Sequence, residues 1–463
     1  MEIKSFQLHN IGRFEHLDVP IAPTKDRPSN VTVLVGNNGA GKTTILNSLA
    51  YSLSWLVARI RKEKGQGVDI PEGVIRNGSN GALVHVDASD KSHKIQQHFC
   101  WDLARTRKGR KSELMSQLSA TSLIADHYRS ALSENGDEAN LPLAVYYSTE
   151  RAVLDVPVRI RKKHSFDQID GYDNALSSNG VEFRRFFEWF RDREDVENES
   201  GISPEWMEDL ISMLQPVVQP GSDNWMQLQH AMKMTQQLRD SQLTAVRAAI
   251  YSFLPGFENL RVRRKPRLHM SIDKNGERLN VLQLSQGEKS LMALVGDIAR
   301  RLAMMNPGLE NPLEGDGIVL IDEVDMHLHP TWQRKIIDRL TATFPNCQFV
   351  LTTHSPLVIS ETKDVLVYSL DDGELTQQKS QYGQDANSVL LEAMDTHPRN
   401  LEITQKLGDL LDAIQDGDLE NARGMMVSLE HELPDGADNL ELIKARFLLR
   451  KQELRREKNN QGL

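Results

Sequence analysis

The stretch "VTVLVGNNGAGKTT", residues 31–44, decides the fold of this chain. Residues 31–35 form an apolar run of buried-strand length, and a glycine-rich loop follows them. After the loop, apolar side chains recur at the spacing of one helix face, at Leu46, Leu49, Leu53, Leu56 and Ile60. A strand, a glycine loop and a helix in this order form the context in which the pattern G-x-x-x-x-G-K-[ST] indicates a phosphate-binding loop.

The residues of this loop have distinct expected roles. Its glycines let backbone N–H groups close around phosphate oxygens, and the helix N-terminus adds the positive end of its dipole. Lys42 is expected to reach the β- and γ-phosphates, and the Thr43 hydroxyl to complete a Mg²⁺ shell. The alternative is a glycine turn that binds nothing. The candidate nucleotide-binding residues of the loop are Gly36, Asn37, Asn38, Gly39, Ala40, Gly41, Lys42, Thr43 and Thr44.

A second stretch, "LSQGEKS" at residues 284–290, marks the start of another helix. Ser285 stands at the N-cap position and Glu288 three residues later, which is the pattern of a capping box. A capped helix N-terminus is also an anion site, and Gly287 lets a phosphate approach the backbone. Ser285, Gly287 and Glu288 are therefore candidate nucleotide contacts as well as helix-capping residues.

The stretch "GIVLIDEVDMHLHP", residues 317–330, is compatible with two chemistries. In one, Asp322 and the pair His327 and His329 hold a transition metal in a hydrolase. In the other, Asp322 ends a buried strand and holds Mg²⁺, while Glu323 polarises a water molecule. A metal hydrolase leaves the phosphate loop and the capped helix without a role. We therefore favour the nucleotide interpretation and expect the two histidines to pack or to fix the loop.

Composition and charge narrow the class of protein. The 463 residues carry a net charge of -10, which argues against a protein that coats nucleic acid uniformly. Three basic runs, at residues 105–111, 159–163 and 261–267, are either solvated faces or the places where DNA is contacted. No apolar run reaches the ~18 residues of a membrane span and the N-terminus lacks a signal pattern, so a cytoplasmic protein without membrane contact is expected.

The order of predicted elements indicates an α/β fold. Residues 81–150 read mostly as strands, and residues 165–255 read as helices. Strands and helices then alternate up to the stretch "VLTTHS", with a helix expected at residues 330–344, and this order predicts a parallel sheet with helical crossovers. From about residue 385 the pattern is helical again.

Taken together, these motifs resemble those of ABC-type ATPases, in which the "LSQGEKS" helix holds the γ-phosphate of ATP bound to another subunit. "DEVDMHLHPTWQ" and "TTHSPLVI" are similar to the soluble AAA15/AAA21 group, which includes the OLD nucleases and several phage-defence ATPases. The resemblance implies ATP and Mg²⁺ as cofactors, with Thr43 and Asp322 at the metal. It also implies that Glu323 and His354 are catalytic and that Asp325, at the D-loop position, contacts the nucleotide.

The same resemblance implies a domain organisation. An ABC-type P-loop ATPase head, built on a mixed sheet with flanking helices, is expected in two lobes, at residues 1–150 and 261–380. A helical lid insertion at residues 151–260 separates the lobes. A helical C-terminal extension at residues 381–463 is expected to serve assembly or partner binding.

Within the group, "VYYSTERAV" and "QYGQDANSVLLEAMD" resemble the PtuA family of Septu and retron-associated antiphage systems. This implies a homodimer or higher oligomer with composite ATP sites, and a separately encoded HNH nuclease similar to PtuB as partner. No nuclease activity is expected in this chain itself. The glutamine that ABC-type ATPases usually carry is replaced by Glu150 and Arg151, so no Q-loop residue is assigned. A DNA-repair or chromosome ATPase, and a scaffold held together by ATP, are the alternatives.

Overall fold

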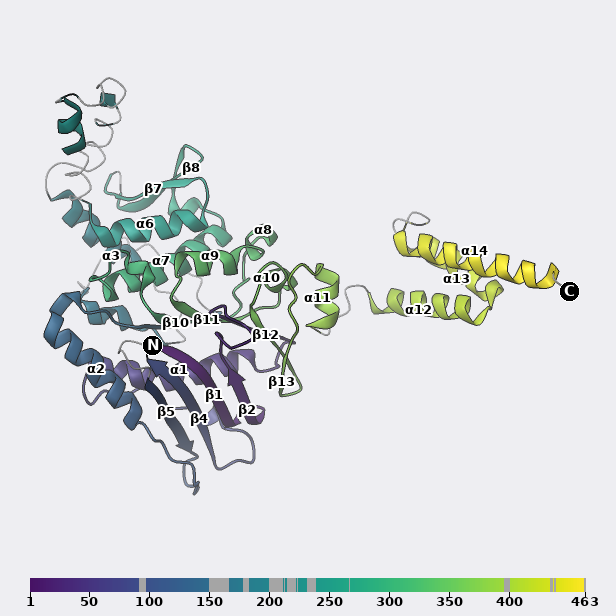
Figure 1. Cartoon of the computed structure of the whole chain (residues 1–463), viewed down its shortest axis with the longest axis horizontal. Helices are drawn as coiled ribbons and strands as arrows, with labels where there is room; N and C mark the ends of the chain where they lie inside the picture. The colour runs from purple at the N-terminus through teal and green to yellow at the C-terminus, as the bar shows by residue number, and fades with distance from the viewer. Residues whose placement is uncertain are drawn as a thin grey trace. The chain divides into compact units, whose positions relative to one another are not determined.

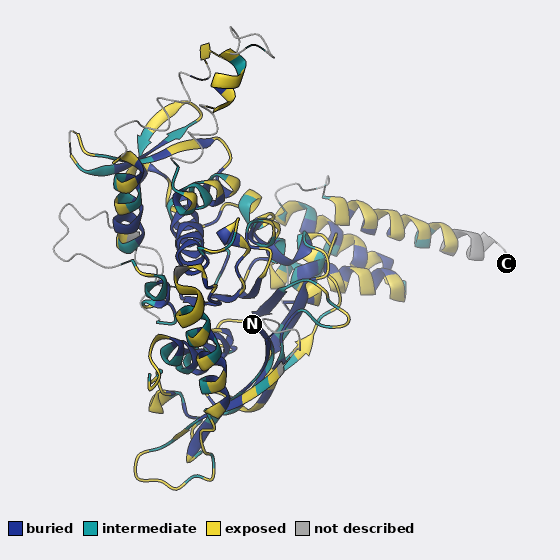
Figure 2. Ribbon diagram, turned by 60° about the vertical axis from the view of Figure 1, so that its left-hand side comes forward, coloured by how far each residue is buried: buried dark blue, intermediate teal, exposed yellow. Residues whose placement is uncertain are grey.

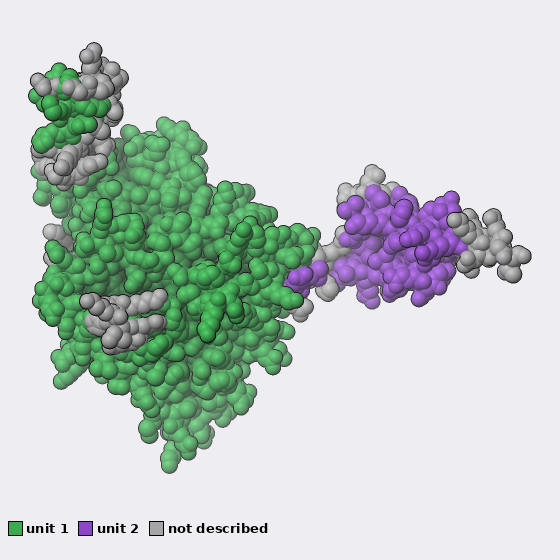
Figure 3. Space-filling model, in the orientation of Figure 1, with its two compact units in different colours: residues 1–389 green, residues 390–463 purple. Residues whose placement is uncertain are grey.

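The computed structural model separates the chain into two compact units, residues 1–389 and residues 390–463 (Figure 3). The residues that the structure describes are 1–90, 97–149, 166–177, 183–199, 211, 213–214, 222, 224–230, 239–265, 267–394, 400–433, 436 and 439–461. Within these ranges no helix has the length and apolar character needed to cross a membrane.

The first unit is built on a six-stranded sheet (Figure 1). Its strand order is β13 (Glu374–Gln377), β12 (Leu366–Asp371), β3 (Val31–Gly36), β11 (Cys347–Thr352), β10 (Gly317–Ile321) and β6 (Leu143–Tyr147). All neighbouring pairs are parallel except β12 and β13. Strands β3, β10 and β11 are buried almost throughout, as strands covered on both faces are. The predicted parallel sheet and α/β fold class are confirmed.

A second, antiparallel sheet covers the other side of the first long helix. Its strands are β2 (Phe14–Pro20), β1 (Glu2–Ile11), β4 (Gly81–Asp90) and β5 (Gln97–Thr106). Helix α1 (Lys42–Arg61) contacts β1 and β4 of this sheet and also β3, β6, β10 and β11 of the six-stranded sheet. The buried Trp101 indole donates a 2.8 Å hydrogen bond to the Ser52 hydroxyl, which ties β5 to α1. Helix α1 is therefore held firmly between the two sheets.

The second long helix, α7 (Gln286–Met305), is buried along almost its whole length. It packs against β6, α3 (Phe183–Asn198) and α6 (Ser241–Phe253), and α6 in turn contacts α9 (Ile336–Thr343). A small antiparallel sheet follows α6; its strands are β7 (Phe257–Arg263), β8 (His269–Lys274) and β9 (Glu277–Asn280). Figure 2 shows the buried residues gathered in the sheets and inner helix faces. The short helices α8 (Pro330–Gln333) and α10 (Pro356–Ser360) also belong to this unit, and α11 (Ala386–Glu392) runs across its last residue, Val389.

Two local predictions are wrong. Residues 81–150 are not mostly strands, because Ser119–Asn135 forms helix α2, which buries Ala120, Ile124 and Tyr128 at helical spacing against α1 and β5. The helix expected from residue 330 to residue 344 is broken in two, since α8 ends at Gln333 and α9 begins at Ile336.

Several predicted features lie outside the described residues. They include Glu150, Arg151 and the basic run at residues 159–163. The described parts of the predicted lid, residues 151–260, include α3 and α6. The predicted domain boundaries remain predictions.

The second unit is a bundle of three helices, as the helical pattern after residue 385 predicts. They are α12 (Leu401–Asp416), α13 (Leu419–Glu432) and α14 (Leu440–Gln461). Gly417 follows α12 with a φ of 77°, the left-handed conformation that ends many helices. The helices enclose their own apolar core, to which Leu410, Ala422, Leu429, Leu442 and Ala445 contribute.

Candidate active site

The phosphate loop lies between the carboxyl end of β3 and the N-terminus of α1. Its shape needs glycine at two positions. A Cβ at Gly36 would lie 2.4 Å from the carbonyl oxygen of Leu370, and one at Gly41 would lie 2.6 Å from the Phe14 ring. No side chain caps the N-terminus of α1 at Gly41, whose φ is 109°. The first N–H groups of α1 are thus left for an anion.

The Lys42 side chain folds back over the loop. Its ammonium group donates hydrogen bonds to the carbonyl oxygens of Gly36 at 2.7 Å and Asn37 at 3.1 Å. Burial lowers the pKa of Lys42, and the carboxylates of Asp322 and Glu323 oppose that shift. An ammonium group whose hydrogen bonds go to neutral carbonyl oxygens can exchange them for stronger bonds to a charged phosphate.

Thr43 and Asp322 meet at the proposed metal position. The Thr43 hydroxyl donates to one Asp322 carboxylate oxygen at 2.7 Å, and the Thr352 hydroxyl donates to the other at 2.6 Å. Asp322 is buried at the end of β10, where an unpaired charge would be costly. A hydroxyl and a carboxylate are hard oxygen donors, and Mg²⁺ is commonly held by one or two carboxylates together with substrate phosphates. The residues present therefore fit Mg²⁺.

Glu323 begins the turn after β10 and is half-buried. Its φ is 48°, a left-handed value that is uncommon for residues other than glycine. The Glu323 backbone N–H donates to the Thr352 hydroxyl at 2.7 Å, and the next N–H, of Val324, donates to the Thr352 carbonyl at 2.9 Å. The end of β11 thus holds this strained turn in place.

The other predicted site residues lie in the loops that follow β10 and β11, at the carboxyl ends of these strands. The Thr353 hydroxyl donates to the Asp325 carboxylate, which fixes the D-loop position to the end of β11. His354 is exposed in the turn before α10. His327 is exposed, and His329 caps α8, where its side chain accepts from the Thr331 N–H. Among the residues described, no group of three or more histidine, cysteine, aspartate or glutamate side chains is placed to hold a metal ion.

The turn between β1 and β2 contributes Arg13, which is not among the predicted site residues. Its guanidinium group donates to the Gly39 carbonyl at 3.3 Å and to the Asp372 carboxylate at 2.9 Å. The neighbouring Phe14 ring packs under Gly41. The antiparallel sheet therefore touches the phosphate loop directly.

The predicted capping box at the start of α7 is confirmed. The Ser285 N–H donates to the Glu288 carboxylate at 2.9 Å, and the Glu288 N–H donates to the Ser285 hydroxyl at 3.4 Å. Lys274 of β8 donates to the other Glu288 carboxylate oxygen at 2.7 Å. Burial works to raise the pKa of Glu288, but the bonds from Lys274 and Ser285 outweigh it and lower that pKa.

Gly287 joins this helix start to the turn after β10. A Cβ at Gly287 would lie 2.6 Å from the His327 carbonyl oxygen and 3.4 Å from the Trp332 ring. Only glycine fits so close to another stretch of backbone. The sequence analysis predicts that the missing side chain of Gly287 lets a phosphate approach the backbone. In the structure, the missing side chain also lets the start of α7 pack closely against His327 and Trp332.

A buried ionic network stabilises α7 further along. The Asp297 carboxylate accepts hydrogen bonds from Arg300 at 2.7 Å, from Arg301 at 2.7 Å and from the Tyr147 hydroxyl at 3.0 Å. Burial would raise the pKa of Asp297, but Arg301 and Arg300 hold it below its ordinary value. Tyr147 ends β6, so the network connects α7 to the six-stranded sheet. The i,i+3 and i,i+4 spacing of Asp297, Arg300 and Arg301 is a local signal that the sequence analysis overlooked, whereas Tyr147 is 150 positions away and could not be found from the sequence.

Comparison with known proteins places this geometry in a family. A family described as "AAA domain, putative AbiEii toxin, Type IV TA system" matches residues 156–360, and one described as "AAA domain" matches residues 5–201. The "Retron Ec83 probable ATPase" of Escherichia coli is 33% identical over 403 residues, which cover 81% of this chain and 72% of that protein. The chain belongs to the family of retron ATPases.

This ATPase is also similar to "Septu protein PtuA" of Bacillus thuringiensis, at 22% identity over 365 residues that cover 77% of this chain and 72% of PtuA. Among solved structures, an SMC head bound to the C-winged helix domain of ScpA matches 82% of the chain and 98% of its own, at 14% identity and a TM-score of 0.45. The predicted resemblance and the ATPase activity are confirmed, while the roles of single residues remain predictions.

Proposed function

We propose that this ATPase is the sensor and regulatory subunit of a two-component antiphage defence system, and that it controls a separately encoded HNH nuclease similar to PtuB. The observation that carries the proposal is membership of the retron ATPase family. The site supports it, because a phosphate loop, a Thr43–Asp322 pair and a capped helix occur in one compact unit. Such parts let a protein change shape when the γ-phosphate of ATP arrives or leaves.

The proposed chemistry assigns a task to each residue. When ATP binds, the Lys42 ammonium group gives up its hydrogen bonds to the loop carbonyl oxygens and contacts the β- and γ-phosphates. Thr43 and Asp322 hold Mg²⁺, which when bound neutralises the charge that develops on the phosphates. Glu323 accepts a proton from the attacking water.

The proposed assembly is a homodimer or higher oligomer with composite ATP sites. In it, the N-terminus of α7 from one chain meets the γ-phosphate held by the phosphate loop of another. The position of this helix start supports the assignment, because the dipole of α7 favours an anion at its N-terminus. The three-helix second unit, with its own core, is proposed to serve assembly or nuclease binding.

The test is copurification of the chain with the product of the neighbouring gene, which the proposal expects to be an HNH nuclease, followed by nuclease assays with and without ATP. We expect Lys42→Ala to abolish the dependence of nuclease activity on ATP. Lys379→Ala, which removes the same charge from an exposed position, is the matched control. A nuclease that neither binds the chain nor responds to ATP through Lys42 would contradict the proposal.

A further inference from the structure

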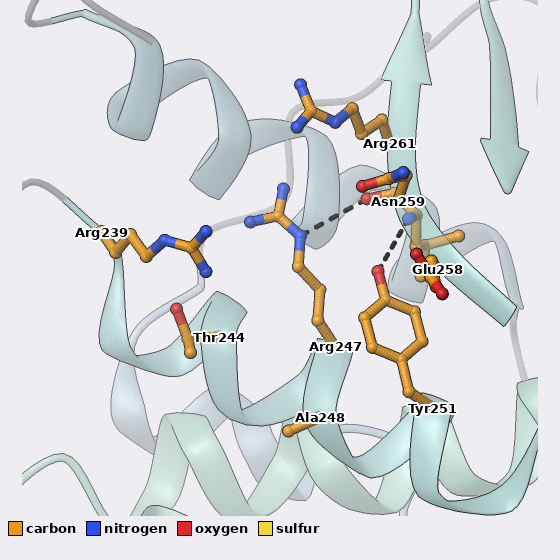
Figure 4. A pocket seen from close by; sticks show the side chains of 9 residues that line it. Arg239, Thr244, Arg247, Ala248, Tyr251, Glu258, Asn259 and Arg261 are labelled. Atoms are coloured by element: carbon orange, nitrogen blue, oxygen red, sulfur yellow. Dashed lines mark hydrogen bonds between the residues drawn. The ribbon is translucent and has the colours of Figure 1, made fainter. Parts of the chain in front are cut away.

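A cavity of about 370 Å³ lies between α6 and β7, and three arginines line it (Figure 4). Arg247 pairs with Glu194 at 3.2 Å and with Glu197 at 3.0 Å. Arg239 and Arg261 also interact with other groups of the chain. The charges at this cavity are thus used within the first unit.

The last helix of the second unit, α14, has apolar residues on two opposite faces. One face contributes Leu442, Ala445 and Leu449 to the core of the three-helix bundle. Successive residues of an α-helix are turned by about 100°, which places a second apolar row on the far side. This row, here called the α14 stripe, consists of the exposed residues Leu440, Ile443, Phe447 and Leu454. Three of its members repeat every seven residues, as in helices that pack against another helix.

Basic residues border the α14 stripe. Lys444 and Lys451 lie along one edge and are exposed. Within the described part of the chain, neither ammonium group has a hydrogen bond or an ion pair. Arg446 and Arg450, along the other edge, are already paired with carboxylates of the same chain. A second α14 helix laid on this stripe would bring basic edges together, so the stripe does not fit its own copy.

Helix α12 exposes the opposite charge. Asp409, Asp412 and Asp416 follow one another at spacings of three and four residues, so they share one face, and all three are exposed. No hydrogen bond or ion pair of these three carboxylates is found among the described residues. Like charges at this spacing destabilise a helix. The acidic row therefore costs α12 stability that no described lysine or arginine offsets.

The surface beside the acidic row is partly apolar and has a gap. Leu401 is 68% exposed and Leu411 is 38% exposed. A Cβ at Gly408 would meet no atom of the chain within 4 Å, although glycine is less favourable than alanine inside a helix. A large side chain such as that of Phe447 can therefore approach the α12 backbone from outside.

Within one chain, the acidic row and the lysines of the stripe are not used on each other. Lys406 of α12 pairs with Glu432 of α13 at 2.8 Å, and Arg446 of α14 pairs with Glu430 of α13. No ion pair among the described side chains joins α12 directly to α14. Both charged surfaces are therefore left for a partner outside the chain.

We propose that the α14 stripe of one copy packs against the acidic face of α12 in a second copy of this chain. This inference rests on the proposed role of the second unit in assembly, and it names the two surfaces. At about 1.5 Å per residue, the stripe from Leu440 to Leu454 is ~21 Å long and α12 is ~24 Å long, so the two match. Complementary charges then select the partner, because Lys444 and Lys451 meet aspartates.

The test measures self-association of the full chain by sedimentation equilibrium. Nucleotide is left out, so that composite ATP sites do not contribute. One variant carries Lys444→Glu and Lys451→Glu, and the other carries Asp409→Lys and Asp412→Lys. Each alone should self-associate about tenfold more weakly or worse, because attraction is replaced by repulsion. An equimolar mixture should regain the association of the parent, since the two reversed surfaces attract each other and the two unchanged ones do as well.

A matched control and two further variants separate charge from packing. Lys62→Glu with Lys64→Glu, at exposed positions after α1, should associate as the parent does. Phe447→Ser and Gly408→Leu should each weaken self-association about tenfold, since one removes an apolar contact and the other fills the gap. Gly408→Leu should melt no lower than the parent, because leucine favours a helix and finds open space in the single chain.

The outcomes distinguish this proposal from the proposed function. Charge variants that associate as the parent does, or a mixture no stronger than its components, would overturn the α14–α12 contact and leave the stripe to the proposed nuclease. A parent that stays monomeric without nucleotide would overturn it too. ATP-dependent assembly and hydrolysis that persist in the charge variants would leave the proposed function intact, because its ATP sites lie in the first unit.

Discussion

The Thr43 hydroxyl donates a 2.7 Å hydrogen bond to the Asp322 carboxylate, across 279 positions of the sequence. It joins the first turn of α1 to the end of β10, at the edge where the parallel strands β3, β10 and β11 all finish. Open parallel sheets bind their ligands at this edge.

The partner of Asp322 on β11 gives the first prediction. Thr352→Val removes the hydroxyl that donates to Asp322 and that accepts the Glu323 N–H. Losing such an outer-shell partner usually lowers metal affinity or activity by about 10–100-fold. We expect ATP hydrolysis by the variant to need a correspondingly higher Mg²⁺ concentration, or to be slower by that factor. Thr376→Val, at an exposed position of β13, should leave the Mg²⁺ titration unchanged.

The second prediction concerns Glu323. Glu323→Gln keeps the size of the side chain at a φ of 48° and removes only its basicity. ATP binding should stay near normal, while hydrolysis should slow by about 10²–10⁴-fold, the usual contribution of a positioned base. Isothermal titration and phosphate-release assays measure the two, with Glu374→Gln as the exposed control. Unchanged turnover would move the role of base to another residue.

A mixing experiment tests the composite site. Ser285→Arg spoils the start of α7 and leaves the phosphate loop intact, whereas Lys42→Ala does the reverse. Each variant alone should hydrolyse little ATP, but a mixture should regain part of the activity, since some sites combine two intact halves. If mixed oligomers form and remain as inactive as the separate variants, the two halves belong to one chain.

The buried Asp297 makes a prediction about stability. Asp297→Ala leaves Arg300 and Arg301 without their carboxylate, and breaking such a buried pair costs about 3–5 kcal/mol of unfolding free energy. The folded pKa of Asp297 lies below the ~3.9 of an unfolded aspartate, so its contribution is complete above that pH. The difference between parent and variant should stay constant from neutral pH to about 5 and shrink only below ~4. Urea titrations at several pH values measure it.

The fifth prediction separates the two units. A chain that ends at Met394 should fold and bind ATP, because residues 1–389 form a compact unit by themselves. We expect it to assemble poorly or to lose the proposed nuclease partner. Light scattering after size-exclusion chromatography and a pull-down of the nuclease measure both. Full assembly and partner binding by the shortened chain would place those contacts in the first unit.

The correct predictions rest on local signals. β3, the glycine loop and α1 follow one another directly in the sequence, and the capping box of Ser285 and Glu288 spans four positions. Both can therefore be recognised from a short stretch of sequence. The sequence analysis missed Thr352, because its role depends on the parallel pairing in which Ile321 faces Leu351. A hydroxyl at the end of a buried strand beside the Asp322 strand is a signal that could have found it.

The missed helix has a simpler cause. Helix α2 shows apolar residues at helical spacing between Ala120 and Tyr128, a pattern that was available in the sequence and overlooked.

The small sheet of β7, β8 and β9 reaches the start of α7 through one side chain. Lys274 of β8 donates to Glu288, whose carboxylate also accepts from the Ser285 N–H. A displacement of this sheet would therefore draw the Lys274 ammonium group away from Glu288 and loosen the N-cap of the most deeply buried helix of the first unit.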